Sequence, residues 1–307
     1  MSDRVAFIDA GTNSFHMIVV DFSQNPEGET VYSRKETIRL GKSLYDTGFL
    51  DEATLSKVDH VFAKFREKAD KHGAEVFVAM ATSAAREAPN GSDIIDIASK
   101  YGIKLNIISG PEEARITRLG VAGPCCDVPT LCVDIGGGST EIALTDGTKD
   151  IYLDSLALGA IRMAFGSGID QSGVVTEEMY NTLRKIVSDI CSDAADAVRG
   201  NFIKVFGSSG TIEAVAEGCA GMRGDEDTSY VLHSELAELM KLMCSLTIEE
   251  RSNIPKVSPK RADIVIGGGV VLDQIMRSFG IERLTVSRTG LREGMKVDYL
   301  IRTRGSA

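Results

Sequence analysis

Two carboxylates flank a glycine-rich turn near the middle of the chain. The segment 131–144 reads LCVDIGGGSTEIAL, with Asp134 before the turn and Glu141 after it. The apolar runs on both sides predict the strands of a β-hairpin, because glycine tolerates the positive φ of a tight turn. Four successive turn residues could direct backbone N–H groups to one anion. They are Gly136, Gly137, Gly138 and Ser139. The segment predicts either a phosphate-binding turn with adjacent metal ligands or a purely structural hairpin.

The same pattern occurs near the N-terminus, in the segment 5–21, at one constant offset and without a gap. The matched pairs are Asp9 with Asp134, Gly11 with Gly136, Ser14 with Ser139 and Asp21 with Asp146. Asn13 adds a side-chain amide to this first turn. A repeated strand–turn–strand unit predicts two related half-molecules, each presenting its turn to a shared cleft.

Three motifs together resemble the exopolyphosphatase / guanosine pentaphosphate phosphohydrolase family of the actin-like, sugar kinase and Hsp70 superfamily. They are DAGTNSFH at 9–16, SGPEEAR at 109–115 and DIGGGSTE at 134–141. The resemblance covers nearly the whole chain and is to a short, two-domain form. It implies an α/β fold of two actin-like (RNase H-like) domains, with mixed sheets flanked by helices and the active-site cleft between them.

Residues 120–129, rich in glycine and proline, mark the expected crossing between the domains. We therefore predict an N-terminal domain at 1–120 and a C-terminal domain at 121–307. By the same resemblance, a last helix at about 291–307 packs back on the first domain.

The first turn of the helix that follows Ser109 carries two neighbouring glutamates. Ser109 and Glu112 have the spacing of a capping box, so Glu112 is expected to bond back to the N-cap amide. Glu113 lies roughly 100° further around the helix and has no such partner. The family resemblance makes the second glutamate of this pair the catalytic base. We predict that role for Glu113; the alternative is a surface carboxylate favoured by the helix dipole.

Several further residues are predicted to contact phosphate. Arg86 is a candidate clamp, because a guanidinium can hold two oxygens at once, unless it is a surface arginine paired with Glu87 or another neighbour. Arg261 is a candidate of the same kind. A glycine-serine turn that opens a helix predicts an anion site at Gly207, Ser208, Ser209 and Gly210. The glycines at 267–269 are interpreted as a second strand-to-helix turn. Either turn could instead serve only packing, and the sequence does not decide whether they bind nucleotide.

Hydrolysis of a phosphoanhydride needs charge neutralisation, a positioned water and a tolerable leaving group. We expect Asp134 and Glu141 to hold Mg²⁺, with Mn²⁺ as the alternative ion, and Asp9 to help order that site. The resulting prediction is an exopolyphosphatase that releases terminal orthophosphate from inorganic polyphosphate. The alternatives are a guanosine pentaphosphate 5′-phosphohydrolase, a small-molecule kinase and a non-catalytic phosphate or nucleotide sensor. The sequence does not rank polyphosphate against guanosine pentaphosphate.

The helices and strands that must position these residues are predicted from hydrophobic periodicity and from the capping, glycine and proline residues that bound each segment. Expected strands beyond the hairpins are 30–40, 75–80, 104–108, 149–158 and 202–206, with a strand–glycine–helix junction at 264–272. Expected helices are 51–72, 91–101 and 176–198, with others starting at Thr82, at Ser109, at the glycine-serine turn within 207–215 and near Gly290. Residues 41–50 are expected to form a loop.

The composition narrows the class of protein. The 307 residues, of which 43% are apolar and 25% charged, predict a soluble globular chain of two domains. The net charge of −10 argues against a nucleic-acid partner. No apolar run approaches the roughly 20 residues of a membrane helix, and a strand begins too early for a signal peptide, so we expect no membrane contact and a cytoplasmic location. Six cysteines without CxxC and four scattered histidines predict reduced thiols and no zinc site. We expect a homodimer.

Overall fold

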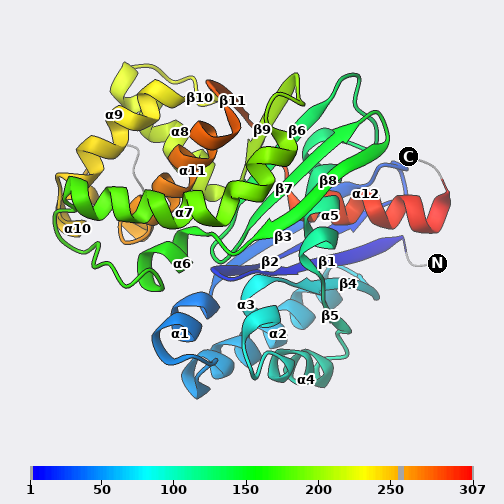
Figure 1. Ribbon diagram of the computed structural model, residues 1–307. Coiled ribbons are helices and arrows are strands. Elements are labelled where there is room, and N and C mark those ends of the chain that lie inside the picture. The colour runs from blue at the N-terminus through cyan, green and yellow to red at the C-terminus, as the bar shows by residue number, and fades with distance from the viewer. Residues whose placement is uncertain (1–2, 255–258, 306–307) are drawn as a thin grey trace.

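The computed structural model describes residues 3–254 and 259–305 and contains two mixed sheets (Figure 1). The first sheet has the strand order β3-β2-β1-β4-β5. Its strands are β1 (Arg4–Ala10), β2 (Ser14–Asp21), β3 (Glu29–Thr37), β4 (Val76–Ala81) and β5 (Leu105–Ile107). Strands β1, β2 and β3 pair antiparallel, whereas β4 pairs parallel with β1 and β5 parallel with β4.

The second sheet repeats this plan in the order β10-β11-β9-β6-β7-β8. Its strands are β6 (Thr130–Ile135), β7 (Thr140–Asp146), β8 (Lys149–Leu156), β9 (Lys204–Ser208), β10 (Tyr230–Leu232) and β11 (Arg283–Val286). An antiparallel meander of β6, β7 and β8 is again extended by a parallel strand, here β9 beside β6. The repeat read from the two turns therefore extends over the three meander strands and the first parallel strand of each sheet.

Helices of the first half largely follow the predicted positions. They are α1 (Leu40–Thr47), α2 (Glu52–Lys71), α3 (Ser83–Glu87), α4 (Ser92–Lys100) and α5 (Gly110–Ala122). The loop expected at 41–50 is wrong, because α1 occupies most of it, and the strand expected to reach residue 40 stops at Thr37. Arg39 takes a left-handed conformation, with φ 63° and ψ 47°, that ends the extended chain. Its N–H and that of Ile38 both bond to Asn13 O, so the first turn itself folds this segment.

Helices of the second half include one that contradicts the sequence interpretation. They are α6 (Ala160–Phe165), α7 (Glu177–Val198), α8 (Gly210–Arg223), α9 (His233–Cys244), α10 (Ile248–Arg251), the short 3₁₀ helix η1 (Pro259–Arg261), α11 (Val265–Phe279) and α12 (Leu291–Arg304). The strand–glycine–helix junction predicted at 264–272 is wrong, since α11 runs through the glycines. Short apolar runs do not distinguish a buried strand from a buried helix. The glycines serve packing: a Cβ at Gly269 would lie 2.2 Å from Met240 Sδ.

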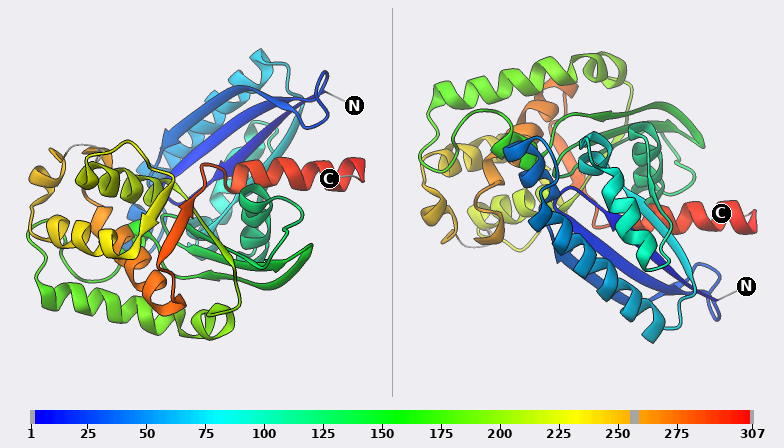
Figure 2. Two further views of the ribbon diagram at one scale, coloured as in Figure 1. Left: turned by 90° about the horizontal axis from the view of Figure 1, so that it is seen from above. Right: turned by 90° about the horizontal axis from the view of Figure 1, so that it is seen from below.

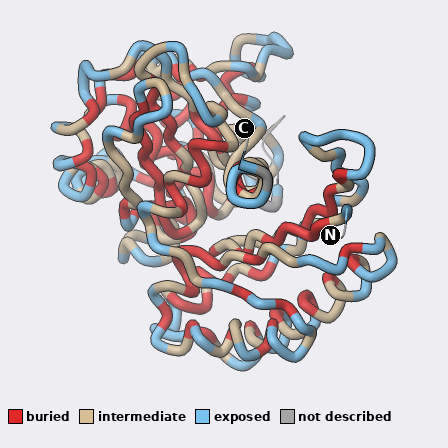
Figure 3. Tube along the Cα trace, turned by 90° about the vertical axis from the view of Figure 1, so that its right-hand side faces the viewer, coloured by how far each residue is buried: buried red, intermediate tan, exposed pale blue. Residues whose placement is uncertain are grey.

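Helices α5 and α12 lie between the two sheets (Figure 2). In Figure 3 the buried segments form two groups, and α12, seen end-on, lies between them. Ile116 and Met295 join a core cluster with Phe7 on β1. The two helices approach closely, because a Cβ at Gly294 would lie 1.7 Å from Ile116 O.

The predicted domain boundary after residue 120 falls inside α5, and α5 also contacts β7 and β8. Positions 1–2, 255–258 and 306–307 of the predicted domains lie outside the described residues. Within the described ranges, no helix combines the length and apolarity needed to span a membrane.

Candidate active site

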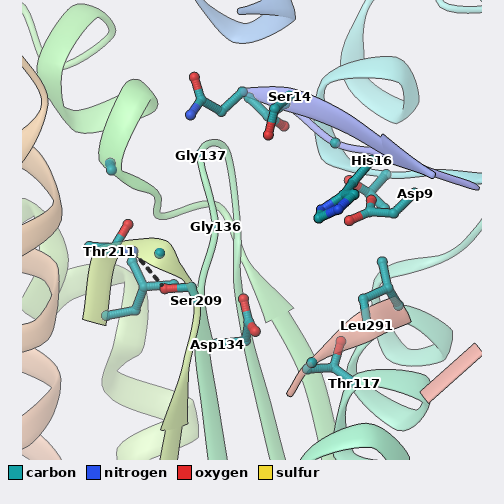
Figure 4. Close-up of a pocket in the computed structure, with 18 of the residues that line it drawn as sticks. Asp9, Ser14, His16, Thr117, Asp134, Gly136, Gly137, Ser209, Thr211 and Leu291 are labelled. Carbon is teal, nitrogen blue, oxygen red and sulfur yellow. Dashed lines mark hydrogen bonds between the residues drawn. The ribbon is translucent and has the colours of Figure 1, made fainter. Parts of the chain in front are cut away.

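A cavity of about 230 Å³ lies where the two hairpin turns meet. Figure 4 shows Asp9, Ser14 and His16 on one side, Asp134, Gly136 and Gly137 in the middle, and Ser209 and Thr211 on the other side. Five carboxylates line the cavity, four of them on the two hairpins and α5 and the fifth on α8. The four are Asp9, Glu113, Asp134 and Glu141, and the fifth is Glu213.

The two turns touch directly. A Cβ at Gly138 would lie 2.8 Å from Thr12 Oγ1 and 2.6 Å from Ser83 Oγ, so only glycine allows this approach. Thr12 Oγ1 in turn accepts the N–H of Ala84 at 3.1 Å. Both turns close in the same way, with the N–H of Gly11 or Gly136 bonded three residues ahead. Glycine in the second turn is therefore needed for the halves to meet.

Ion pairs also join the halves around the cavity. Arg39 Nη1 lies 2.6 Å from Asp263 Oδ2, and Arg162 Nη2 lies 2.5 Å from Glu87 Oε2. Glu87, the alternative partner predicted for Arg86, is therefore paired with Arg162 instead.

Glu113 is buried, with 5% of its surface exposed, at the start of α5. Arg86 Nη1 donates to Glu113 Oε2 at 3.0 Å and to Ile108 O at 2.9 Å. Burial raises the pKa of Glu113 to about 7, against the lowering effect of the Arg86 charge and hydrogen bond. The site thus holds a carboxyl group whose basicity is matched to neutral pH.

The capping prediction for Glu112 is half right. Ser109 Oγ accepts the N–H of Glu112, as expected of an N-cap. The Glu112 carboxylate turns instead to Arg115 Nε at 2.7 Å and Arg302 Nη2 at 2.9 Å. Two guanidiniums, one of them on α12, compete successfully for the carboxylate, so Glu112 links the two central helices.

The other three carboxylates are also kept basic by burial. Burial raises the pKa of both Asp9 and Asp134 to about 6; Arg292 opposes the shift at Asp9, and a hydrogen bond from Ser208 opposes it at Asp134. Burial also raises the pKa of Glu141 well above its ordinary value, and the neighbouring charge of Glu113 adds to the shift. Keeping the carboxylates of this buried cluster ionised costs free energy unless a cation binds beside them.

The donor set fits Mg²⁺. The oxygens are carboxylates, and the buried Oδ1 of Asn13 has no hydrogen-bond partner among the described residues. No group of three His, Cys, Asp or Glu side chains in the described ranges is arranged to hold a metal by itself. Mg²⁺ commonly takes one or two protein carboxylates and completes its shell with water and substrate phosphate.

Most predicted phosphate contacts line the cavity, but three do not. Those that do are Gly11, Asn13, Ser14, Gly136, Gly137, Gly138, Ser139, Ser209, Gly210 and Arg261. Arg86 lies behind Glu113 rather than on the wall. Gly207 and Ser208 belong to β9, where a Cβ at Gly207 would lie 2.4 Å from Leu284 Cδ2. Ser209 has φ 113°, a conformation that costs an L-residue of order 1–3 kcal/mol and is typical of functional sites.

Sequence reasoning missed several charged residues of the wall. Lys35 lines the cavity from β3, and Arg288 and Arg292 line it from either side of Gly290. Strand register explains Lys35, because Asp9 pairs with His16 and His16 pairs with Lys35 across the first sheet. Arg288 and Arg292 flank the Thr289-Gly290 segment that starts α12, so a basic pair beside that glycine was the available signal.

Comparison with known proteins gives a consistent result. The model of the Ppx/GppA phosphatase family matches residues 19–303. The chain is 28% identical over 314 residues to Exopolyphosphatase 2 of Mycobacterium tuberculosis, covering 95% of this chain and 97% of that protein. A crystal structure of an exopolyphosphatase from Cytophaga hutchinsonii superposes with a TM-score of 0.87 at 25% identity, covering 99% of this chain and 100% of that one. The Aquifex aeolicus member of the Ppx/GppA family gives a TM-score of 0.79 at 23% identity, with 99% of both chains covered. The expected fold, two actin-like domains with mixed sheets, is confirmed.

Proposed function

The chain belongs to the Ppx/GppA phosphatase family, and from this premise we propose that it is an exopolyphosphatase that releases terminal orthophosphate from inorganic polyphosphate. The observation that carries the proposal is Glu113, a buried carboxylate with a pKa of about 7 that faces a cavity lined by two phosphate turns. In our proposal its ionised form orients a water and takes its proton as the water attacks the terminal phosphorus. Arg86 holds the carboxylate in place through Oε2.

The phosphate itself is bound by the two turns. Gly137, Gly138 and Ser139 line the cavity and supply backbone N–H donors in our proposal, while the N–H of Gly136 closes the turn on Ser139 O. Asn13 and Ser139 add side-chain donors. Asp134 and Glu141 would hold Mg²⁺, with Mn²⁺ as an alternative, and Asp9 would order that site. When bound, the ion neutralises charge on the phosphate oxygens.

An inorganic chain fits the cavity better than a nucleotide. Among the described lining residues there is no Phe, Tyr or Trp to stack on a guanine base, while Lys35, Arg261, Arg288 and Arg292 supply positive charge. We therefore place polyphosphate ahead of guanosine pentaphosphate as substrate. A non-catalytic sensor would have no use for the placed base at Glu113.

The proposal is tested by measuring phosphate release from polyphosphate and from guanosine pentaphosphate in parallel, with Mg²⁺ and with chelator. Wild type and Glu113→Gln are compared, and calorimetry records the binding of each substrate. We expect Mg²⁺-dependent release from polyphosphate by wild type only, with binding kept in the variant. Binding of both substrates without release from either would instead establish a sensor.

A cytoplasmic location and a homodimer stay part of the proposal. The six cysteines, which are all free, support a reducing compartment. Fractionation of cells tests the first, and the mass in solution tests the second.

A further inference from the structure

Glu213 lines the cavity among its cations, and its negative charge also helps to raise the pKa of Asp134. It occupies the first turn of α8 and lines the cavity with Lys35, Arg261 and Arg288. Burial raises the pKa of Glu213, whereas the charges of Arg261 and then Lys35 lower it. The carboxylate is therefore within electrostatic reach of both cations.

The space between these three side chains is open. In the described part of the chain, the side chains of Glu213, Lys35 and Arg261 form no hydrogen bond or ion pair with each other or with other residues. Arg261 lies flat on the start of α8, where a Cβ at Gly210 would be 2.1 Å from its Nη2. Lys35 comes from the first sheet and the other two from the second half. The group exists only because the two halves meet, and it has room for a ligand.

We propose that Glu213 is a specificity-determining residue that limits how many phosphates the cleft accepts. This rests on the proposed function. With the terminal phosphate beside Glu113 and Glu141, the next phosphates lie towards Lys35 and Arg261. Glu213 places a negative charge beside them, so a longer polyanion is repelled where the cations would otherwise attract it. The cleft then favours short chains.

The same carboxylate could instead accept N–H groups of a guanine base. The described lining residues include no Phe, Tyr or Trp, so the cavity lacks the large aromatic wall that such recognition normally uses. The observations favour the inorganic chain, and base recognition becomes an outcome of the test.

The test compares Glu213→Gln, which keeps the shape and removes the charge, with Glu217→Gln. Glu217 lies one turn later on α8, is exposed and does not line the cavity. The readout is the ratio of kcat/KM for long polyphosphate to kcat/KM for tripolyphosphate, at fixed Mg²⁺ and salt. We expect Glu213→Gln to raise this ratio about 3- to 10-fold through KM, less so at high salt. Glu217→Gln should change it much less, because the charge of exposed Glu217, although it acts on Arg261, is screened by solvent.

An unchanged ratio in Glu213→Gln would overturn the proposal, as would a selective loss of guanosine pentaphosphate turnover, which would assign the carboxylate to a base. Calorimetric binding of long and short polyphosphate to both variants keeps the test independent of turnover. Wild type that binds polyphosphate without releasing phosphate would refute the exopolyphosphatase, while the binding ratio would still decide the role of Glu213.

Discussion

The two halves share a backbone plan but differ in the row of side chains behind each hairpin turn. In the first half the strand register aligns Asp9, His16 and Lys35 across three strands. In the second half it aligns Asp134, Glu141 and Ser155. With Asp9 ionised, the first row combines one negative and one positive charge. With Asp134 and Glu141 both ionised, as a bound cation would favour, the second row has two negative charges and a hydroxyl. The repeat therefore conserves the turn and divides the electrostatic tasks.

The partners of each row follow this division. In the second row Ser155 Oγ donates to Glu141 Oε1 at 2.7 Å, and hydrogen bonds from Ser139 and Ser155 both oppose the rise in the pKa of Glu141 and so favour its ionised form. In the first row His16 Nε2 lies 2.9 Å from Ser33 Oγ, and Lys35 faces Arg261 across the cavity. We infer that the second half is the metal side of the cleft and the first half its phosphate side.

The largest effect is expected from Glu113, which adds its charge to the second row. Glu113→Gln should lower kcat by about 10²–10⁴-fold while substrate binding persists, because the variant cannot take a proton from water. Stopped-time phosphate assays and calorimetry measure the two quantities.

Glu112→Gln is the matched control for that variant. It removes ion pairs with Arg115 and Arg302, so it should cost up to about 1 kcal/mol of unfolding free energy and leave kcat unchanged. If Glu112→Gln lost turnover and Glu113→Gln kept it, the assignment of Glu113 as the general base would be wrong.

The second prediction contrasts equivalent positions in the two rows. Glu141→Gln, like Asp134→Asn, should raise the Mg²⁺ concentration for half-maximal activity by about tenfold or more, as loss of a metal-site partner commonly does. His16→Gln, at the position that matches Glu141, should leave this concentration unchanged. A Mg²⁺ titration of phosphate release measures it, and equal shifts in both rows would refute the division of tasks.

A third, smaller effect separates the ends of the rows. Lys35→Gln should raise KM for polyphosphate about 3- to 10-fold and weaken its dependence on salt, because one cation facing the substrate is lost. Ser155→Ala should act on the Mg²⁺ requirement instead, through Glu141. Steady-state kinetics at two salt concentrations distinguish the two; a salt-insensitive KM change in Lys35→Gln would argue for a steric role.

The sequence predicted the turns because their chemistry is local. Asp9, Asp134 and the glycines between strands are recognisable from short-range pattern alone, whereas the role predicted for Glu113 rests on the family resemblance, with its helical position showing only that it lacks a capping partner. The division of labour between the halves was not accessible in this way. Lys35 reaches the cavity through register across β1, β2 and β3, and Arg288 through the start of α12, which lies far along the chain.

The incorrect sequence predictions also arise from contacts between residues distant in the sequence. From sequence alone the glycines of α11 predict a strand and a turn. Their actual role is close packing against residues distant in sequence, such as Met240 and Thr211. Helix α1 was read as a loop because Asn13 O, distant in sequence, organises its start. The competition of Arg115 and Arg302 for Glu112 also depends on α12. Tertiary packing decides each of these cases.

The smallest predicted effect concerns a property that the rows share. Asp9 and Asp134 both have a pKa of about 6, raised from 3.8 mainly by burial. A carboxyl with a raised pKa binds its proton more tightly in the folded than in the unfolded protein, so between these two values the folded state gains stability as pH falls. In chelator, lowering the pH from 7 to 5 should therefore add of order 1 kcal/mol per group to the free energy of unfolding. Asp9→Asn and Asp134→Asn should each lose this increment, by similar amounts, in urea unfolding at the two pH values.

Saturating Mg²⁺ should abolish the increment of Asp134 more fully than that of Asp9, since an ion held by the second row keeps its carboxylates ionised. Equal responses of both groups to Mg²⁺ would mean that the first row shares the ion, and the assignment of the metal to one half would have to be withdrawn.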